Sequence, residues 1–335
     1  MRRVAPGLLR AASGMAVALC LVLSSNLTGA EAKTIKFAWT STDSPTDPYG
    51  IVGAEFKKNL EELTNSELEV QLFPNRQLGD EKEILEGIRF GTIEAGVVTN
   101  AVVANVHKPL QVNDMPFLYP SAEVAHRILD GELGQELLAG LEDKGIIGLR
   151  FCEGGFRSMI NNVRPVTQPS DVEGVKYRVM QNPVYIGMFS SLGGNAVPMA
   201  WGEVFPAVQQ GALDGLEIPI MIIDATKYYE VTKYLSLTNH TYSAILALMS
   251  KRIFDGLTPE QQSAVREAAV RTCDTQRARV AETVEATIKG LGEKGMEVNQ
   301  VEDVAPFREK VKPVYEQFRE EIGSDRLDSF LAAVN

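Results

Sequence analysis

The segment at residues 174–219 constrains the fold most, because it predicts a unit of parallel β-strands and helices. Residues 175–179 alternate in polarity and include β-branched valines, which indicates a short strand. Asn182 and Pro183 predict a helix start, since Asn is a favoured N-cap and Pro suits the first helical turn. The segment continues with a predicted strand, helix and strand, at residues 196–199, 203–210 and 213–218. This alternation predicts an α/β fold with crossover helices.

Several polar and aromatic residues fall at or just after the predicted strand ends of this segment. They are Arg178, Gln181, Trp201 and Glu217. Parallel α/β units bind ligands in the crevice outside the carboxyl ends of their strands, so these are candidate ligand-binding residues. Arg178 also lies shortly before the predicted helix start, and a guanidinium close to a helix N-terminus favours a bound carboxylate. The alternative for Arg178 is an ordinary ion pair with an acidic side chain.

The N-terminal part of the chain predicts a second unit of the same kind. Predicted strands alternate with helices at residues 34–39, 50–64, 68–73, 80–90 and 95–98. Asp80 is the expected N-cap of the second of these helices. The strand ends place further residues on the crevice side, namely Trp39, Thr40, Thr99 and Asn100. Two such units joined by crossing strands are typical of binding proteins that close around a ligand by a hinge.

Gly154 and Gly155 mark a candidate crossing between the two units, because paired glycines permit sharp backbone turns. They follow a predicted strand at residues 146–151. The long apolar run within residues 233–250 predicts a buried strand that returns to the first unit.

Helix signals recur in the rest of the chain. Ser170 and Glu173 are interpreted as one capping box, and Thr258 and Gln261 as another. The second box opens the longest helical pattern in the chain, which extends to about residue 291. Further helices are predicted at residues 121–141 and 304–321.

The N-terminus has the pattern of a cleaved signal peptide over residues 1–32. Basic residues precede an apolar run at residues 15–23, and the small residues Ala30 and Ala32 fit a cleavage site. The apolar run is too short to span a bilayer, which argues against the alternative of a retained membrane anchor. We therefore expect an exported protein that begins at Lys33.

The sequence lacks the patterns of common catalytic and metal sites. It has no CxxC, HExxH, GxSxG, P-loop or GxGxxG motif, and its 3 histidines are scattered. We therefore expect no catalytic residue, no metal and no cofactor. His240 is interpreted as a hydrogen-bonded structural residue. Asp214 and Glu217 would lie on opposite faces of a strand, which argues against a glycosidase-type acid/base pair.

The net charge and the cysteines limit the partners and the disulfide content. A net charge of −11 argues against nucleic acid as a partner. The chain after the predicted cleavage site keeps Cys152 and Cys273. In an exported protein these form either one disulfide or two separate buried thiols, and the sequence leaves both open.

A series of short motifs resembles one family over nearly the whole chain after residue 32. In order they are FPNRQLGD (73–80), DMPFL (114–118), GFR (155–157), DVEG (171–174), KYRVM (176–180), VPM (197–199), EVFPA (203–207) and QGALDGLE (210–217). The chain resembles the DctP-like solute-binding receptors of tripartite ATP-independent periplasmic (TRAP) transporters. The resemblance implies a two-lobed periplasmic-binding-protein-like α/β fold, with hinge strands and a long helix that spans both lobes.

The same resemblance implies domain boundaries and roles for individual residues. Domain I comprises residues 33–154 plus about 244–283, and domain II comprises residues 155–243 plus about 284–335. Arg178 is expected to bind the ligand carboxylate through two hydrogen bonds, Gln181 to bind on the same side, and Trp201 to wall the pocket. Arg157 is expected as a second basic contact, with an interdomain salt bridge as the alternative. Ile218 stands where the family usually has Asn, and its side chain cannot hydrogen-bond.

The resemblance implies a periplasmic receptor and not an enzyme. It would capture a small organic acid, either a dicarboxylate or a sugar acid, and deliver it to the small and large membrane subunits of a TRAP transporter. Trp39, Asn100 and Glu217 join the expected site through their strand-end positions. The alternatives are the ligand-binding subunit of a sensor system and, further, an exported enzyme that acts on an organic acid.

Overall fold

The computed structural model describes residues 32–334, so the predicted signal peptide before Ala32 lies outside the described residues. The segment at 174–219 folds into the predicted unit. Its elements are β5 (Lys176–Val179), α6 (Pro183–Ser191), β6 (Asn195–Pro198), α7 (Trp201–Gln209) and β7 (Gly215–Pro219). β5 pairs in parallel with both β6 and β7. The Asn182 side chain accepts a hydrogen bond from the Val184 backbone N–H at 2.8 Å, which confirms the predicted N-cap of α6.

The N-terminal unit also has the predicted element order. It consists of β1 (Lys33–Ala38), α1 (Pro48–Leu63), β2 (Leu68–Phe73), α2 (Glu81–Phe90) and β3 (Ala95–Thr99). β1 pairs in parallel with β2 and β3. Asp80 precedes α2, but its side chain makes no capping hydrogen bond there. Its Oδ2 instead accepts a hydrogen bond from the Gly202 backbone N–H of α7 at 3.0 Å, so this carboxylate caps a helix of the other unit.

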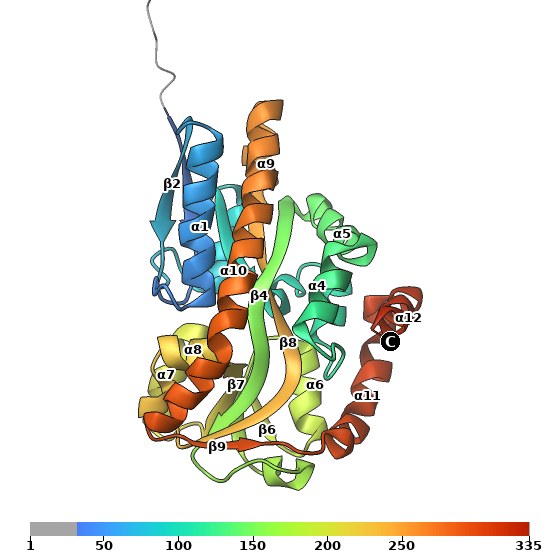
Figure 1. Ribbon diagram of the computed structural model, residues 1–335. Coiled ribbons are helices and arrows are strands. Elements are labelled where there is room, and N and C mark those ends of the chain that lie inside the picture. Colours follow the sequence, from blue (N-terminus) through green and yellow to red (C-terminus); the bar gives the residue numbers. More distant parts are fainter. Residues whose placement is uncertain (1–31, 335) are drawn as a thin grey trace, which may run out of the picture. The chain divides into compact units, whose positions relative to one another are not determined.

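Two long antiparallel strands, β4 (Ile146–Asn161) and β8 (Tyr234–Ser250), join the units into one sheet (Figure 1). The strand order is β2-β1-β3-β8-β4-β7-β5-β6, with β9 (Glu297–Gln300) beside β8. β4 was expected to end at residue 151, but it continues through the glycine pair with a shift in register between Glu153 and Gly155. Extended pairing with β8 outweighs the turn preference of the glycines. The domain boundary drawn at this point stays a prediction.

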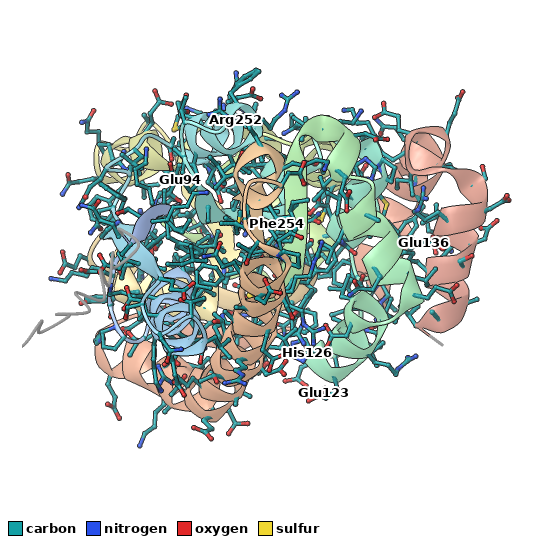
Figure 2. The ribbon with its side chains drawn as sticks, turned by 90° about the horizontal axis from the view of Figure 1, so that it is seen from above. Glu94, Glu123, His126, Glu136, Arg252 and Phe254 are labelled. Atoms are coloured by element: carbon teal, nitrogen blue, oxygen red, sulfur yellow. A yellow bond between two sulfur atoms is a disulfide. The ribbon has the colours of Figure 1, made fainter. Side chains whose placement is uncertain are left out.

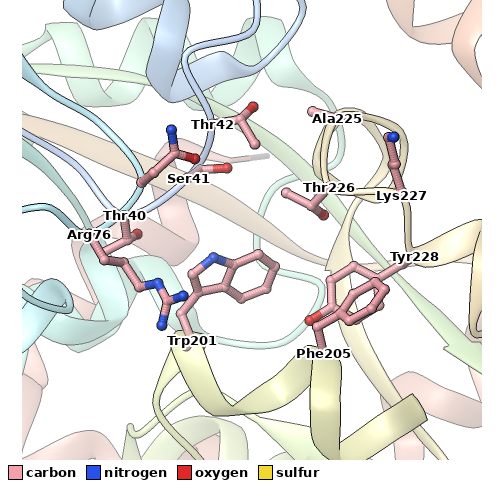
Figure 3. Close-up of a pocket in the computed structure, with 12 residues that line it drawn as sticks. Thr40, Ser41, Thr42, Arg76, Trp201, Phe205, Ala225, Thr226, Lys227 and Tyr228 are labelled. Atoms are coloured by element: carbon pink, nitrogen blue, oxygen red, sulfur yellow. The ribbon is translucent and has the colours of Figure 1, made fainter.

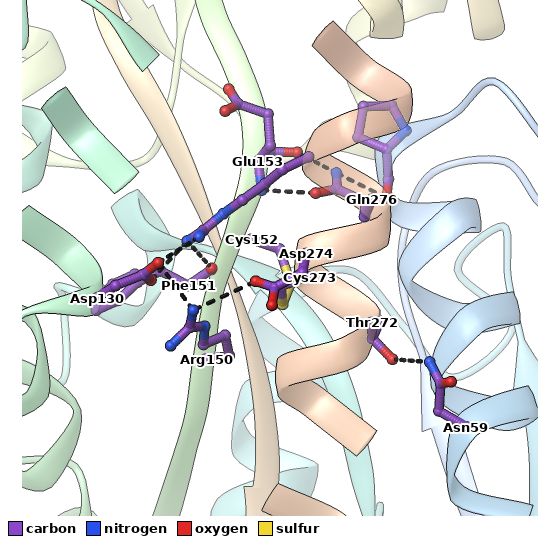
Figure 4. The surroundings of a disulfide bond; sticks show 12 residues. Asn59, Asp130, Arg150, Phe151, Cys152, Glu153, Thr272, Cys273, Asp274 and Gln276 are labelled. Carbon is purple, nitrogen blue, oxygen red and sulfur yellow. Dashed lines mark hydrogen bonds and ion pairs between the residues drawn. A yellow bond between two sulfur atoms is a disulfide. The ribbon is translucent and has the colours of Figure 1, made fainter. Parts of the chain in front are cut away.

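The helix α10 (Pro259–Glu293) is the longest described helix, with 35 residues. Thr258 and Gln261 form both hydrogen bonds of the predicted capping box. A disulfide between Cys152 and Cys273 joins β4 to α10, which decides between the two alternatives left open by the sequence (Figure 4). Beside it, Gln276 accepts a hydrogen bond from the Glu153 backbone N–H at 2.9 Å.

The prediction of one continuous helix at residues 121–141 is wrong, because the structure has two helices there. α4 (Ala122–Asp130) and α5 (Glu132–Ala139) are separated by Gly131, whose extended backbone ends one helix and begins the next. The prediction of a capping box formed by Ser170 and Glu173 is also wrong. The box in the structure uses Gln168 and Asp171, because Pro169 takes the first helical position.

The remaining elements complete the described chain. Short helices are α3 (Asn100–Val103), η1 (Lys108–Asp114), η2 (Glu142–Lys144), η3 (Pro169–Val172), α8 (Ile220–Ala225), η4 (Tyr228–Glu230) and α9 (Lys251–Phe254). α11 (Ala305–Ile322) matches its prediction, whereas α12 (Ser324–Ala333) and β9 were not predicted. Among residues 32–334, no helix combines the length and the apolar character needed to cross a membrane.

Apolar side chains pack on both faces of the sheet. Along β8, alternate residues belong to two different clusters, with Leu246 and Leu248 in one and Ile245 and Ala247 in the other. This alternation follows from the two-residue period of a strand, and it means that helices must cover both faces. The polar groups at the strand ends therefore lie between two layers of buried apolar side chains.

Candidate functional site

A small cavity of about 40 Å³ lies where the ends of both parallel units meet β4. We call it the inner cavity. Its polar wall consists of Tyr49, Glu81, Thr99, Arg157 and Arg178, and its apolar wall includes Met180, Trp201 and Ile218. It adjoins a more open hollow of about 340 Å³, the outer hollow, because Thr40, Ser41 and Trp201 line both (Figure 3).

Arg178 is a buried cation without a paired anion. Its side chain is 2% exposed, and its Nε and Nη2 both donate to the Met199 carbonyl oxygen, at 2.9 and 2.7 Å. Within the described part of the chain, no carboxylate oxygen lies within 4.0 Å of its nitrogens. Burial lowers the pKa of Arg178, although an arginine stays protonated at physiological pH. An unpaired buried charge is costly, so this position favours an anionic ligand.

Arg157, in contrast, already has an anionic partner. Its Nη2 donates to Glu217 Oε1 at 3.0 Å and to the Glu217 carbonyl at 2.8 Å, and its Nε donates to Glu217 Oε2. Burial alone would raise the pKa of Glu217, but Arg157 and His240 outweigh it and hold that pKa below its usual value. The pair is therefore ionised and neutral overall. Arg157 still lines the inner cavity, so its direct contact with a ligand stays a prediction.

Glu81 is a cavity residue that the sequence interpretation missed. It is 7% exposed, and its Oε1 accepts a hydrogen bond from the Thr99 backbone N–H at 2.7 Å. Tyr49 Oη lies 2.7 Å from Thr99 Oγ1, which extends this polar chain along the wall. Burial raises the pKa of Glu81, while the hydrogen bonds from Thr99 oppose that shift. In the sequence, an acidic residue in the first turn of a helix is equally explained by the helix dipole.

Trp201 and Ile218 both line the inner cavity, and a ligand contact of Trp201 stays a prediction. The Trp201 ring centre lies 6.0 Å from the Arg178 guanidinium carbon, within the range of a cation–π contact. Ile218 is 2% exposed and faces the cavity with an apolar side chain. The family usually has Asn at this position, and Ile218 makes this part of the cavity wall apolar.

Other expected site residues do not line either the inner cavity or the outer hollow. Trp39 is fully buried in the apolar cluster beneath α1, with its Nε1 donating to the Thr42 carbonyl at 2.8 Å. Gln181 is exposed, and its carbonyl accepts from Asn105 Nδ2 at 2.9 Å. A strand-end position fixes where the backbone ends but not the direction of the next side chain, so the ligand contacts of both stay predictions.

Asn100 belongs instead to a buried polar network between the units. Its Nδ2 donates to Asp114 Oδ1 at 3.0 Å, and Asn182 Nδ2 donates to Asp114 Oδ2 at 3.0 Å. Asn182 also donates to the Ala101 carbonyl at 2.8 Å. Burial raises the pKa of Asp114 to about 7. Together with the bond between Asp80 and α7, these contacts hold the two units together beside the inner cavity.

The His240 side chain is fully buried behind the Arg157–Glu217 pair. Its Nδ1 lies 2.7 Å from Thr238 Oγ1, and its Nε2 lies 3.7 Å from Glu217 Oε2. Burial lowers the pKa of His240. Over residues 32–334, no group of three or more His, Cys, Asp or Glu side chains is arranged to hold a metal ion.

Comparison with known proteins establishes the family. The model of bacterial extracellular solute-binding protein family 7 (DctP) matches residues 40–321, so this chain belongs to that family. The 2,3-diketo-L-gulonate-binding periplasmic protein YiaO of Escherichia coli is 36% identical over 267 residues, covering 80% of this chain and 81% of that one. The C4-dicarboxylate-binding periplasmic protein DctP of Rhodobacter capsulatus is 30% identical over 322 residues, covering 95% and 96%.

Solved structures of TRAP periplasmic solute-binding proteins share the fold. One from Polaromonas bound to D-erythronate has a TM-score of 0.87 and 35% identity, covering 90% of this chain and 98% of that one. The sugar acid binding protein DctPAm from Advenella mimigardefordensis in complex with galactonate has a TM-score of 0.87 and 33% identity, covering 91% and 98%. The chain is a TRAP DctP-like solute-binding protein with the two-lobed α/β fold, and its relatives are binding proteins and not enzymes.

Proposed function

We propose that this protein is the periplasmic receptor of a TRAP transporter for a hydroxylated monocarboxylic acid of the sugar-acid class. The observation that carries the proposal is Arg178, a buried guanidinium that has no carboxylate of the described chain within 4.0 Å. A ligand carboxylate would accept both hydrogen bonds that Arg178 now donates to the Met199 carbonyl. This exchange places the acid group beside the Trp201 ring.

The charge balance of the inner cavity favours one carboxylate over two. Arg157 is neutralised by Glu217, which leaves Arg178 as the one unpaired guanidinium among the described residues of this wall. Glu81 lines the same cavity and, when ionised, repels a second carboxylate. A dicarboxylate would require another unpaired cation, and the described lining supplies none.

The same wall suits a ligand with hydroxyl groups. Glu81 Oε2 has no hydrogen-bond partner within residues 32–334, so it is free to accept from a ligand hydroxyl. The hydroxyl groups of Thr40, Tyr49 and Thr99 offer donors and acceptors nearby. D-Erythronate and galactonate, bound by two of the related structures, are hydroxylated acids with a single carboxylate.

Binding requires the cavity to widen, because about 40 Å³ is too small for a sugar acid. The contacts that hold the two units together, Asp80 with Gly202 and Asp114 with Asn182, would break in an open form. Re-forming them over the ligand would bury the carboxylate by hinge closure. The closed form would then dock on the small and large membrane subunits, after export to the periplasm by the predicted signal peptide.

A thermal-shift screen of residues 33–335 tests the proposal. The panel contains D-erythronate, galactonate and glucuronate, with succinate and malate as dicarboxylates and galactose as a neutral sugar. A ligand at 100 times its Kd stabilises the native state by about 2.7 kcal/mol. We expect a sugar acid to do so, and Arg178→Ala to abolish the shift, while the surface control Arg319→Ala leaves it intact. Equal binding by Arg178→Ala would refute the carboxylate assignment.

The same sample separates the rival classes. A receptor returns its ligand unchanged, so conversion of the bound acid during incubation, followed by NMR, would favour the exported enzyme. A sensor subunit would share the fold and the site. Co-purification with TRAP membrane subunits, as opposed to a membrane kinase, decides between transport and sensing.

A further inference from the structure

A second cavity, of about 470 Å³, lies beside the inner cavity along β4. We call it the hinge cavity. Phe156 lines it, whereas the next residue, Arg157, lines the inner cavity. The two cavities therefore share β4 as a common wall. The same division recurs where β7 meets α8, with Pro219 at the inner cavity and Ile220 at the hinge cavity.

The floor of the hinge cavity is the irregular part of β4. Gly154 and Gly155 line it, and the register with β8 shifts between Glu153 and Gly155. Gly155 has a φ of +97°, a backbone conformation that side chains other than glycine rarely adopt. A Cβ on Gly154 would collide with the Ser243 carbonyl oxygen. Glycine is therefore needed at both positions for β4 to take this bend.

Both predicted domains contribute to the lining. Ala122 and His126 come from the α4 side, and Ile220 and Met221 come from α8. The long helix α10 closes the remaining side (Figure 2, where His126 and Glu123 are labelled between α4 and α10). The width of the hinge cavity thus depends on the angle between the two domains.

The lining has an apolar body and an acidic end. Phe156, Ile220, Met221, Val280, Val284 and Ile288 form the body. At the other end, Glu153 is 4% exposed, and its Oε2 accepts from Tyr242 Oη at 3.0 Å and lies 2.6 Å from His126 Nε2. Its Oε1 has no hydrogen-bond partner within residues 32–334.

The charges at this end favour a cation. Glu123 also lines the cavity and adds a second carboxylate. Arg277 is the one guanidinium of the described lining, and Asp130 neutralises it through contacts of 2.7 and 3.0 Å. Glu153 Oε1, which accepts no hydrogen bond from the described residues, can accept one from a charged donor.

We propose that the hinge cavity binds a small amphiphilic cation, with its ammonium group at Glu153 and its apolar body against α8 and α10. The cavity is present in the structure in which Asn182 donates to Asp114. An occupant that contacts the linings from both predicted domains opposes a change in the angle between them, and therefore opposes the rotation that opens the inner cavity. Its binding therefore strengthens the binding of the organic acid, and the acid strengthens its binding by the same factor.

The first experiment measures binding without any organic acid. The probe is n-hexylammonium chloride, compared with sodium hexanoate and n-hexanol by calorimetry on residues 33–335. We expect hexylammonium to bind one site, and hexanoate not to bind. Ala281 is an exposed residue of α10 that lines the cavity, so the Ala281→Trp side chain would fill it. This variant should bind hexylammonium with an affinity lower by about tenfold or more. Ala286→Trp, exposed on the same helix but outside the lining, is the matched control.

Equal binding of hexanoate, or hexylammonium binding that survives Ala281→Trp, would overturn the assignment of this cavity. Glu153→Gln should reduce the preference for hexylammonium over hexanol, which tests the head-group contact. If this variant unfolds, the Ala281→Trp comparison still decides.

The second experiment measures the coupling, which rests on the proposed function. The Kd of the acid selected in the screen should fall about fivefold or more when hexylammonium is saturating, and the Kd of hexylammonium should fall equally when the acid is saturating. Unchanged constants would refute the coupling. If no acid binds but hexylammonium does, the proposed function fails while the hinge-cavity assignment stands.

Discussion

The surroundings of Arg157 and of Arg178 differ although both guanidinium groups are buried in the same cavity wall. Arg157 is held by the carboxylate and the carbonyl of Glu217. Arg178 is held by a neutral carbonyl, that of Met199. The Arg157 side chain needs no ligand for charge balance, because Glu217 neutralises it within the folded chain. The second arrangement leaves the Arg178 guanidinium without a carboxylate of the described chain in contact, which is why we propose Arg178 and not Arg157 as the partner of a ligand carboxylate.

The largest expected effect is the loss of stability when Arg157 is removed. Arg157→Ala leaves Glu217 as an unpaired buried charge, which costs on the order of 3–5 kcal/mol of unfolding free energy. Arg178→Ala should leave the unfolding free energy near that of wild type while it abolishes acid binding. Urea denaturation of both variants measures the contrast. Similar losses of stability in both would mean that the two arginines are equivalent. Adding Glu217→Leu to the Arg157 variant should recover much of its loss.

A second prediction extends the comparison to a buried carboxylate that lacks a cation. The pKa of Asp114 rises from 3.8 to about 7 in the folded protein, so the folded state binds this proton more tightly than the unfolded state. The contribution of Asp114 to stability is therefore present below about pH 4 and is lost as the pH rises through 7. Asp114→Asn should remove this decline, as measured by urea denaturation between pH 4 and 7.5. Parallel pH curves for wild type and variant would contradict it.

A third prediction concerns Glu81, whose carboxylate lines the inner cavity together with Arg178. Glu81→Gln should weaken the binding of a hydroxylated acid by about 1.5–3 kcal/mol, which is the cost of losing a hydrogen bond to a charged group. The same change should improve the binding of succinate, because the repulsion of a second carboxylate disappears. Calorimetry with both ligands measures the change in preference. A Glu81→Gln protein with the wild-type preference would show that Glu81 does not contact the ligand.

The smallest expected effect tests the ring beside Arg178. Trp201→Leu keeps an apolar wall but removes the cation–π contact, worth about 0.5–2 kcal/mol. The affinity for the acid should fall by a corresponding modest factor, with little change in thermal stability. Phe205→Leu in the adjoining outer hollow is the control, and it should leave the affinity unchanged. Equal effects of the two changes would mean that Trp201 acts by packing alone.

The elements that carry the site were predictable because their signals are local. Asn182-Pro183 begins α6, and the strands on either side have short apolar patterns, so the position of Arg178 at a strand end followed directly. The partner of Arg157 was not predictable. It depends on the pairing of β4 with β7, in which Arg157 lies opposite Pro219 and Glu217 is its diagonal neighbour. The glycine pair suggested that β4 ended earlier, so this pairing was absent from the prediction.

Side-chain direction limited the rest of the site prediction. Thr99 is the last residue of β3 and Thr40 lies just after β1, and both line the inner cavity. Trp39 and Asn100, one residue away, do not. A shift of one position reverses the face, and the pattern of a single sequence does not resolve that. Glu81 was missed for a different reason, since its importance depends on Arg178 lying nearby in space.

The bond between Cys152 and Cys273 has a consequence for how the chain survives damage. It spans 121 positions of sequence, and the whole segment at 174–219 lies inside that loop. A single cut by a protease between these cysteines would leave both pieces covalently attached to each other. A nicked receptor would therefore migrate as two fragments under reducing conditions and as one molecule otherwise. Such a tether would keep a cleaved binding protein in one piece.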